Sequence, residues 1–215
     1  WCSELSTHAL MSRPAPRQAV DARAFSAYQL LSRVHCNPHS SGAPLYRLEL
    51  QAIDGTAPHW QAGALVEVLA EATNTLPADH QVGTVAPPST PRRYSVASLP
   101  EDGGIQLWVR QVQHGGRLGL ASGWLTQGLP LHGIVQLRLL ANPHFAPKQP
   151  SEPSESLAIF IGNGSGYAGL RAQLLSRIRQ QQHQNWFLFG ERHPQADRWA
   201  ETEISKWQAS GLLRH

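Results

Sequence analysis

The last third of the chain constrains the fold most strongly, because its apolar runs alternate with a glycine-rich turn and a helical pattern. The expected elements are a strand at 157–161, a turn at 162–166, a helix at 169–182, a strand at 186–189 and a helix at 195–209. Strand, turn, helix and strand in this order form a βαβ unit, whose two strands lie parallel in one sheet. Gly211 is the expected stop of the last helix.

The residues before Pro147 have a different pattern, with many short strand-like runs separated by turn formers. The expected strands are 27–34, 45–53, 64–69, the Arg92–Ser95 stretch, 105–112 and 135–140. Asp54-Gly55 is a hairpin signal, and the alternation in 105–112 is typical of an edge-exposed strand. Many short strands at this spacing favour an antiparallel barrel over a sandwich.

The predicted fold class is therefore β + α/β, with an antiparallel barrel followed by a partial parallel sheet. We expect a linker or the tail of a preceding domain at 1–20, the alternative being an integral part of the barrel. The barrel domain is assigned to 21–150 and the α/β domain to 151–215, which appears incomplete at its C-terminal end. Pro, Ser and Glu residues at 148–156 mark the boundary between them. Both ends of the sequence are expected to be cuts through a larger protein.

Composition excludes several classes of function. The net charge is +3 and the pI is near 9.2, an excess too modest and scattered to favour nucleic-acid binding. No apolar run approaches the roughly 20 residues that a membrane-spanning helix needs. Two cysteines, Cys2 and Cys36, indicate no disulfide framework. His35-Cys36-x-x-His39 lacks a fourth ligand and contains Pro38, so no metal site is predicted.

Three short motifs carry the chemistry. In Arg92-Arg93-Tyr94-Ser95, a strand would place Arg92 and Tyr94 on one side and Ser95 on the other. Such a stretch supplies a two-pronged phosphate donor, a flat aromatic face and a hydroxyl donor. The alternative is an ordinary half-buried barrel strand with a surface arginine.

The other two motifs are helix entries. Gly119 to Leu125 begins with small residues, which allow a phosphate to approach backbone N–H groups, although an ordinary serine-containing cap would look the same. Gly162-x-Gly164-Ser165-Gly166 follows a strand and precedes a helix, which is the context of a nucleotide diphosphate turn. Glycine permits a positive φ and a close approach of the backbone there.

These three motifs in this order resemble the ferredoxin–NADP reductase family, and they are most similar to its flavodoxin-fused (diflavin, sulfite-reductase flavoprotein-like) members. The resemblance implies FAD on the barrel and NADPH on the α/β domain. By the same resemblance, Tyr94 packs on the flavin ring, Arg92 pairs with its diphosphate and Ser95 lies at its hydride-accepting edge. The further flavin contacts that it implies are Val96 after this motif, Trp108, Val109 and Arg110 around the adenosine side, and Gly119, Leu120, Ala121 and Ser122 around the diphosphate.

For the nucleotide, the resemblance implies contacts from Gly162, Gly164, Ser165, Gly166, Gly190 and Arg192. Two positions depart from the family pattern. Gly169 stands where a proline is usual, which loosens the helix start by roughly 1 kcal/mol or less. Glu191 stands where the family has a cysteine that lies near the nicotinamide, so Glu191 joins Ser95 as a candidate catalytic residue, either contacting the carboxamide or slowing the reaction.

The resemblance implies an NADPH-dependent reductase that passes electrons singly to an acceptor, such as a fused FMN-binding flavodoxin domain. The expected location is the cytoplasm, with the full-length protein able to be tethered at the cytoplasmic face of a membrane. Two alternatives stay open. One is a stand-alone flavin or ferric-chelate reductase, and the other is a non-enzymatic sensor or regulatory module that retains the fold.

Overall fold

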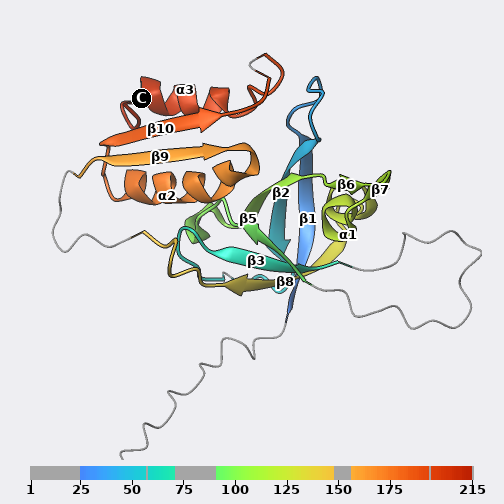
Figure 1. Ribbon diagram of the computed structural model, residues 1–215. Coiled ribbons are helices and arrows are strands. Elements are labelled where there is room, and N and C mark those ends of the chain that lie inside the picture. The colour runs from blue at the N-terminus through green and yellow to red at the C-terminus, as the bar shows by residue number, and fades with distance from the viewer. Residues whose placement is uncertain (1–24, 57, 71–90, 148–155, 194, 215) are drawn as a thin grey trace, which may run out of the picture.

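The computed structural model describes residues 25–56, 58–70, 91–147, 156–193 and 195–214 (Figure 1). The linker expected at 1–20 and nearly all of the segments 73–91 and 148–156 lie outside these residues. The domain boundaries expected at 20 and 150 also lie outside the described residues, so they stay predictions.

The described residues before Pro147 form a six-stranded antiparallel sheet with the strand order β4-β3-β8-β1-β2-β5. Its strands are β1 (Ser26–His35), β2 (Leu45–Ala52), β3 (Leu65–Leu69), β4 (Arg92–Ser95), β5 (Ile105–Arg110) and β8 (Ile134–Leu140). The backbone N–H of Ala97, just after β4, donates to the carbonyl of Gln106 on β5. This bond joins the two edges of the sheet, and the antiparallel barrel is confirmed.

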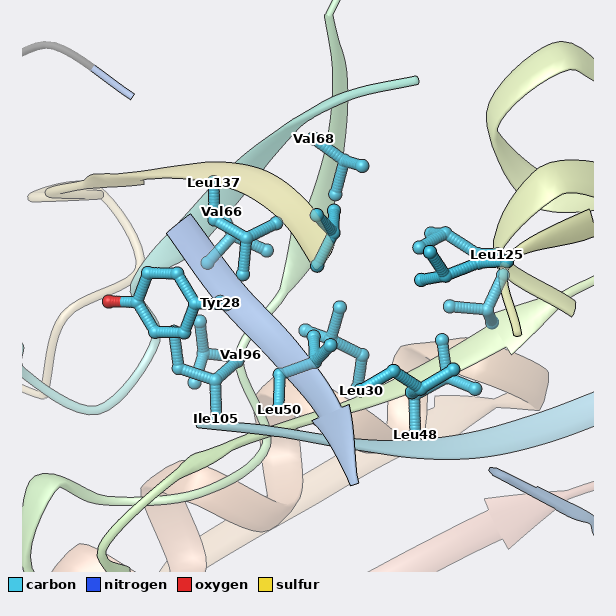
Figure 2. Close-up of a cluster of buried hydrophobic side chains, with 14 of the residues drawn as sticks. Tyr28, Leu30, Leu48, Leu50, Val66, Val68, Val96, Ile105, Leu125 and Leu137 are labelled. Atoms are coloured by element: carbon cyan, nitrogen blue, oxygen red, sulfur yellow. The ribbon is translucent and has the colours of Figure 1, made fainter. Parts of the chain in front are cut away.

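Alternating apolar side chains from all six strands fill the barrel (Figure 2). Leu30, Leu48, Val66 and Leu107 are fully buried, and Tyr94 packs against this cluster from β4. A bulge between Leu30 and Ser32 interrupts the β1–β2 register and leaves Leu31 exposed. Burial of these side chains, at about 25 cal/mol per Å² of apolar surface, is the main stabilising term of the barrel.

Short elements follow β5. The two-stranded ribbon of β6 (Gln113–His114) and β7 (Arg117–Leu118) leads into α1 (Leu120–Gly123) and then a π-helical turn, Trp124–Gly128. Leu125 from that turn points into the barrel (Figure 2). The helix entry expected at 119–125 is therefore present, and its apolar residue closes one end of the core.

The C-terminal part of the chain contains a two-stranded parallel sheet of β9 (Ala158–Asn163) and β10 (Asn185–Gly190). The turn Gly164–Gly166 and helix α2 (Tyr167–Arg179) connect the strands, and α3 (Glu201–Ala209) follows them. Leu174 from α2 and Trp207 from α3 pack with Phe160 and Phe187 in one cluster. Both helices therefore cover the same face of the sheet, and the predicted βαβ unit is confirmed.

The opposite face of this parallel pair is apolar as well, but no described residue covers it fully. It carries the side chains of Ile159 (52% exposed), Ile161 (71%), Trp186 (37%) and Leu188 (49%). Parallel sheets normally bury both faces.

Three sequence expectations need correction. The Asp54-Gly55 turn does not close a hairpin, because β2 pairs with β1 and β5 whereas β3 pairs with β4 and β8. The strand β5 is the last strand in the sheet order, as predicted for an edge, but its outer face is not exposed, since Trp108 is 7% exposed and packs against Tyr167 of α2. The last helix begins at Glu201 rather than 195, because Asp197 accepts hydrogen bonds from the N–H of His193 and the side chain of Asn37, which holds a turn against the barrel.

Candidate functional site

The glycine-rich turn after β9 has the geometry that a close ligand approach requires. Gly164 has a positive φ of 52°, and Gly166 precedes α2 without a side-chain cap for the first helical N–H groups. A Cβ on Gly162 would lie 2.5 Å from the Cδ1 atom of Leu170, so glycine is needed there for the packing of the helix on the strand. The uncapped N–H groups and the helix dipole make this helix start favourable for an anion.

A cavity of about 590 Å³ opens at this turn. It lies at the carboxyl ends of β9 and β10, where open α/β sheets usually bind their ligands. It is lined by Ala43, Arg110, Asn163, Gly164, Ser165, Gly166, Gly190, Glu191 and Arg192. The structure therefore brings together the residues predicted from the nucleotide half of the sequence, except Gly162, which does not line the cavity. It adds Asn163 and two residues from the barrel, Ala43 and Arg110.

Arg110 connects the barrel to this cavity. Its Nη2 atom lies 3.0 Å from the Oε1 atom of Glu191, and its Nη1 donates to the carbonyl of Ala43 at 2.8 Å. The resemblance implied a contact of Arg110 with the adenosine side of the flavin, whereas the structure places its guanidinium beside the nucleotide turn. The Glu191 carboxylate also accepts a hydrogen bond from the indole N–H of Trp199 at 3.2 Å.

The molecule has two structural units, the barrel and the C-terminal α/β unit that begins at β9. The strand β4 of the barrel presents its motif next to the α/β unit. Arg92 is exposed, whereas Tyr94 and Ser95 are half-buried, and burial raises the pKa of the Tyr94 phenol to about 12. The phenol therefore stays neutral at physiological pH. A Cβ built on Gly169, in the first turns of α2, would lie 3.6 Å from the Cβ of Ser95 and 2.9 Å from the ring of Phe145. Glycine at 169 thus lets α2 approach Ser95 and Phe145 closely.

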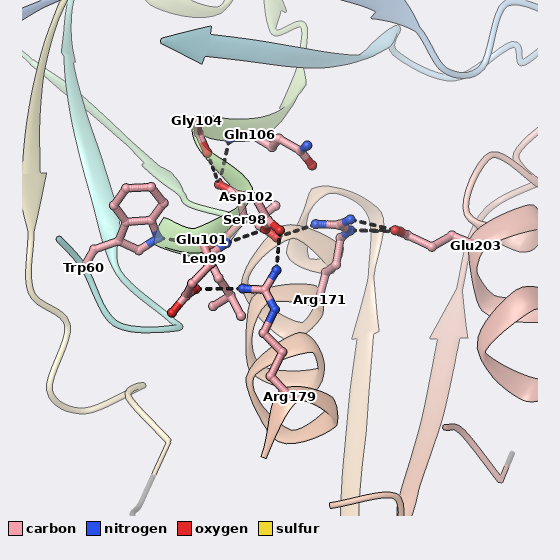
Figure 3. Close-up of polar contacts among 11 residues, drawn as sticks. Trp60, Ser98, Leu99, Glu101, Asp102, Gly104, Gln106, Arg171, Arg179 and Glu203 are labelled. Atoms are coloured by element: carbon pink, nitrogen blue, oxygen red, sulfur yellow. Dashed lines mark hydrogen bonds and ion pairs between the residues drawn. The ribbon is translucent and has the colours of Figure 1, made fainter. Parts of the chain in front are cut away.

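A hydrogen-bonded turn fixes the end of β4 (Figure 3). The hydroxyl of Ser98, fully buried, donates to the carbonyl of Gly104 and accepts from the N–H of Gln106. The indole N–H of Trp60 donates to the Ser98 carbonyl at 3.0 Å. These bonds hold the backbone that follows Ser95 against β5.

Arg171 of α2 bridges the two units at the same place (Figure 3). Its guanidinium donates to the carbonyl of Ala97 at 2.7 Å, forms a two-pronged pair with Glu203 of α3 and lies 5.5 Å from the ring centre of Trp108. Sequence reasoning missed Arg171, since an arginine on a helix gives no sign of its partners. Sequence reasoning also missed Phe145, Asn163 and Trp199, because nothing in the local pattern shows what their side chains contact.

The predicted diphosphate segment 119–122 lies at the start of α1. A Cβ on Gly119 would meet the Oγ atom of Ser122 at 2.8 Å, so glycine is required here. Ala121 and Ser122 are buried and Leu120 is half-buried. The Ser122 hydroxyl accepts the N–H of Val112 at 3.1 Å, so a ligand contact of this serine would come from its backbone.

The remaining predicted flavin contacts are enclosed. Val96 and Val109 are fully buried in the barrel core, so a contact with a ligand would have to come from their backbone atoms. Trp108 packs with Tyr167 and Trp199 in the cluster that joins the two units. The side chains of these residues therefore stabilise the packing around the site.

The residues present fit both groups that the resemblance implied. At the nucleotide turn, the cavity, the positive φ of Gly164 and the two arginines suit a ligand with a diphosphate. On the barrel, Arg92, Tyr94 and Ser95 supply a phosphate donor, an aromatic face and a hydroxyl next to α2. Within the described residues, no cluster of three or more His, Cys, Asp or Glu residues is placed to hold a metal ion, and no helix is long and apolar enough to cross a membrane.

No protein-family model matches the chain. Among curated proteins, it is 34% identical over 134 residues to the sulfite reductase [NADPH] flavoprotein alpha-component of Mannheimia succiniciproducens, covering 59% of this chain and 22% of that protein. It is 30% identical over 184 residues to the NADPH-dependent diflavin oxidoreductase 1 of Mus musculus, covering 77% of this chain and 30% of that protein. The chain thus spans about a quarter of the length of these relatives. Over the matched residues, the chain is homologous to the ferredoxin–NADP reductase-like part of these proteins.

Solved structures agree with this fold. The ferredoxin-NADP+ reductase from Plasmodium falciparum with 2'P-AMP superposes with a TM-score of 0.68 at 12% identity, over 88% of this chain and 70% of that chain. The Amycolatopsis cytochrome P450 reductase GcoB gives a TM-score of 0.65 at 22% identity, over 89% of this chain and 50% of that chain. These likenesses show the fold of an FAD-binding barrel and part of a nucleotide-binding domain.

Proposed function

We propose that this FNR-like chain is the reductase module of a larger protein, which binds FAD on the barrel and NADPH in the cavity at the glycine-rich turn. The observation that carries the proposal is the junction of the two units. A Cβ built on Gly169, in the first turns of α2, would lie 3.6 Å from the Cβ of Ser95, and Arg110 of the barrel reaches the nucleotide turn. A nucleotide held at this turn would therefore lie close to a ring held at β4.

On the barrel, Arg92 would pair with the flavin diphosphate, and the half-buried phenol of Tyr94 would pack on the flavin ring. The hydroxyl of Ser95 would donate a hydrogen bond at the reacting edge. The chemistry that a bound flavin supplies is the acceptance of a hydride and the release of electrons one at a time. The protein's part is to exclude water and to fix the geometry.

At the cavity, the N–H groups after Gly164 and the guanidinium groups of Arg110 and Arg192 would hold the phosphates of NADPH. The positively charged rim favours an anionic nucleotide over a neutral one. We propose a flavodoxin domain carrying FMN as the acceptor, because relatives at 30% identity or above are a diflavin oxidoreductase and a sulfite reductase flavoprotein.

Two variants of FAD-loaded protein test these roles by anaerobic stopped-flow reduction with NADPH. Ser95→Ala should slow flavin reduction on the order of a hundredfold while the affinity for FAD stays close to that of the wild type. Arg92→Ala should weaken FAD binding by roughly ten- to a hundredfold, because a charge-assisted pair with phosphate is lost. The reverse pattern, with Ser95→Ala losing the flavin and Arg92→Ala slowing reduction, would show that these roles are wrongly assigned.

A further inference from the structure

One side chain of the cavity carries a negative charge, like the phosphates of the proposed ligand. Glu191 places a carboxylate on the wall of a cavity whose other charged side chains are Arg110 and Arg192. The Glu191 side chain is 11% exposed and that of Arg110 is 27% exposed, so their ion pair is partly shielded from water. Shielded ion pairs are stronger than exposed ones.

The pair uses one of the guanidinium donors that a phosphate at the turn could use. The Nη1 atom of Arg110 is bound to the carbonyl of Ala43, and its Nη2 atom is bound to Glu191. That guanidinium also lies next to the turn, with Nη2 at 3.5 Å and Nε at 3.8 Å from the position of a Cβ on Gly164. A diphosphate on the N–H groups of this turn would reach Arg110 on the side where Glu191 now binds it.

From this geometry, and resting on the proposed function, we propose that Glu191 is an internal competitor of the nucleotide phosphates for Arg110. Binding is then an exchange, in which a phosphate oxygen replaces the Glu191 carboxylate on Nη2. The carboxylate keeps its hydrogen bond from the indole of Trp199 after the exchange. Glu191 thus lowers the affinity for phosphorylated nucleotides and speeds their release, instead of acting on the nicotinamide.

The competition depends on the residue at position 191, because a neutral residue there would leave the Nη2 atom of Arg110 available to a phosphate. It also gives Arg192 a distinct role. Arg192 is exposed at the rim, and within the described residues it forms no ion pair. A phosphate therefore meets Arg192 without such competition, whereas the Nη2 atom of Arg110 beside the turn is already bound by a carboxylate.

Calorimetric titration of the FAD-loaded chain with NADP+ and with inorganic pyrophosphate tests the proposal. Glu191→Gln removes the charge but keeps an oxygen acceptor for Trp199, so NADP+ and pyrophosphate should bind about tenfold more tightly. Arg110→Gln should weaken both ligands by a similar factor. In the Arg110→Gln background, Glu191→Gln should change neither affinity, because the competition requires Arg110.

Glu101→Gln is the matched control. It removes the same charge beside Arg179, the last residue of α2, at the end of the helix opposite the cavity, and it should leave NADP+ affinity unchanged. Glu191→Cys is a second neutral variant with the same expected tightening, should Glu191→Gln fold poorly by its thermal melt.

The outcomes separate the two proposals. If wild-type protein binds NADP+ but neither neutral variant tightens binding, or both weaken it, Glu191 orders Arg110 for the ligand and the competition is overturned. If wild-type protein binds neither NADP+ nor pyrophosphate, and Arg110→Gln changes nothing, the proposed nucleotide site itself is wrong.

Discussion

The barrel sends side chains from all six strands into one closed core, whereas the parallel pair of β9 and β10 buries only one of its two faces. The buried face of the parallel pair also relies on the barrel, because Leu45, Ala97 and Trp108 belong to the cluster that contains Phe160 and Phe187. The barrel therefore supplies part of the hydrophobic core of the α/β unit. The candidate nucleotide cavity is lined by residues of both parts of the chain.

The largest expected effect tests the closed core. Leu48 is fully buried in the barrel, so Leu48→Ala should lower the free energy of unfolding by about 2–5 kcal/mol. Leu188, 49% exposed on the open face of the parallel pair, is the matched control, and Leu188→Ala should change stability by no more than about 0.5 kcal/mol. Urea titration of both variants measures the difference. Equal losses would mean that the open face is covered as well as the core.

A smaller effect is expected at the contact of the units. Arg171→Met removes the donor to Ala97 and leaves Glu203 with the Tyr167 hydroxyl but without its cationic partner. The loss should cost about 2 kcal/mol, less than for a fully buried pair because Glu203 is 33% exposed. Hydrogen exchange should show faster exchange in α2 and α3 and unchanged protection in β1 and β2.

Arg179→Met serves as the control for that variant. Arg179 is 38% exposed against 12% for Arg171, and its partner Glu101 is 69% exposed, so the loss should stay below about 1 kcal/mol. If barrel strands lose as much protection as α2 in Arg171→Met, the two units unfold together and the comparison drawn above fails.

The smallest effect depends on pH. Hydrogen bonds from Arg138, followed by those from Arg93, hold the pKa of the Glu67 carboxyl below its ordinary value of 4.5. A lowered pKa in the folded state stabilises the protein fully above pH 4.5, and the contribution is lost as the pH falls through the lowered value. Glu67→Gln should thus cost about 1 kcal/mol at neutral pH and progressively less in acid.

Thermal melts across this pH range, with Glu49→Gln as an exposed control, measure the Glu67 contribution. A cost that stays constant down to acid pH would show that packing of the side chain, and not its charge, matters at position 67.

The local pattern of the sequence was enough for the elements that their own residues define. The strands around Leu48 and Leu107 and the helix after Gly166 follow from periodicity and glycine placement, which are local properties. The start of α3 did not follow, because Asp197 is bound by Asn37, which is far away in the sequence.

The same limit applies to the candidate site. The motifs named the residues of the glycine-rich turn, and the cavity contains them. The placement of Arg110 beside Glu191, and of Arg171 on Ala97, depends on how the two units pack, which no local pattern records. The burial of Trp108 by Tyr167 has the same origin.

The central claim is that the contact of the two units brings a nucleotide at the glycine-rich turn within reach of a flavin at Ser95. The most direct test is the addition of NADPH to FAD-loaded protein under anaerobic conditions, followed by the visible absorbance of the flavin. The flavin absorbance band should be bleached by NADPH, and it should return when oxygen is admitted. Protein that retains FAD but keeps its full absorbance in excess NADPH would contradict the account.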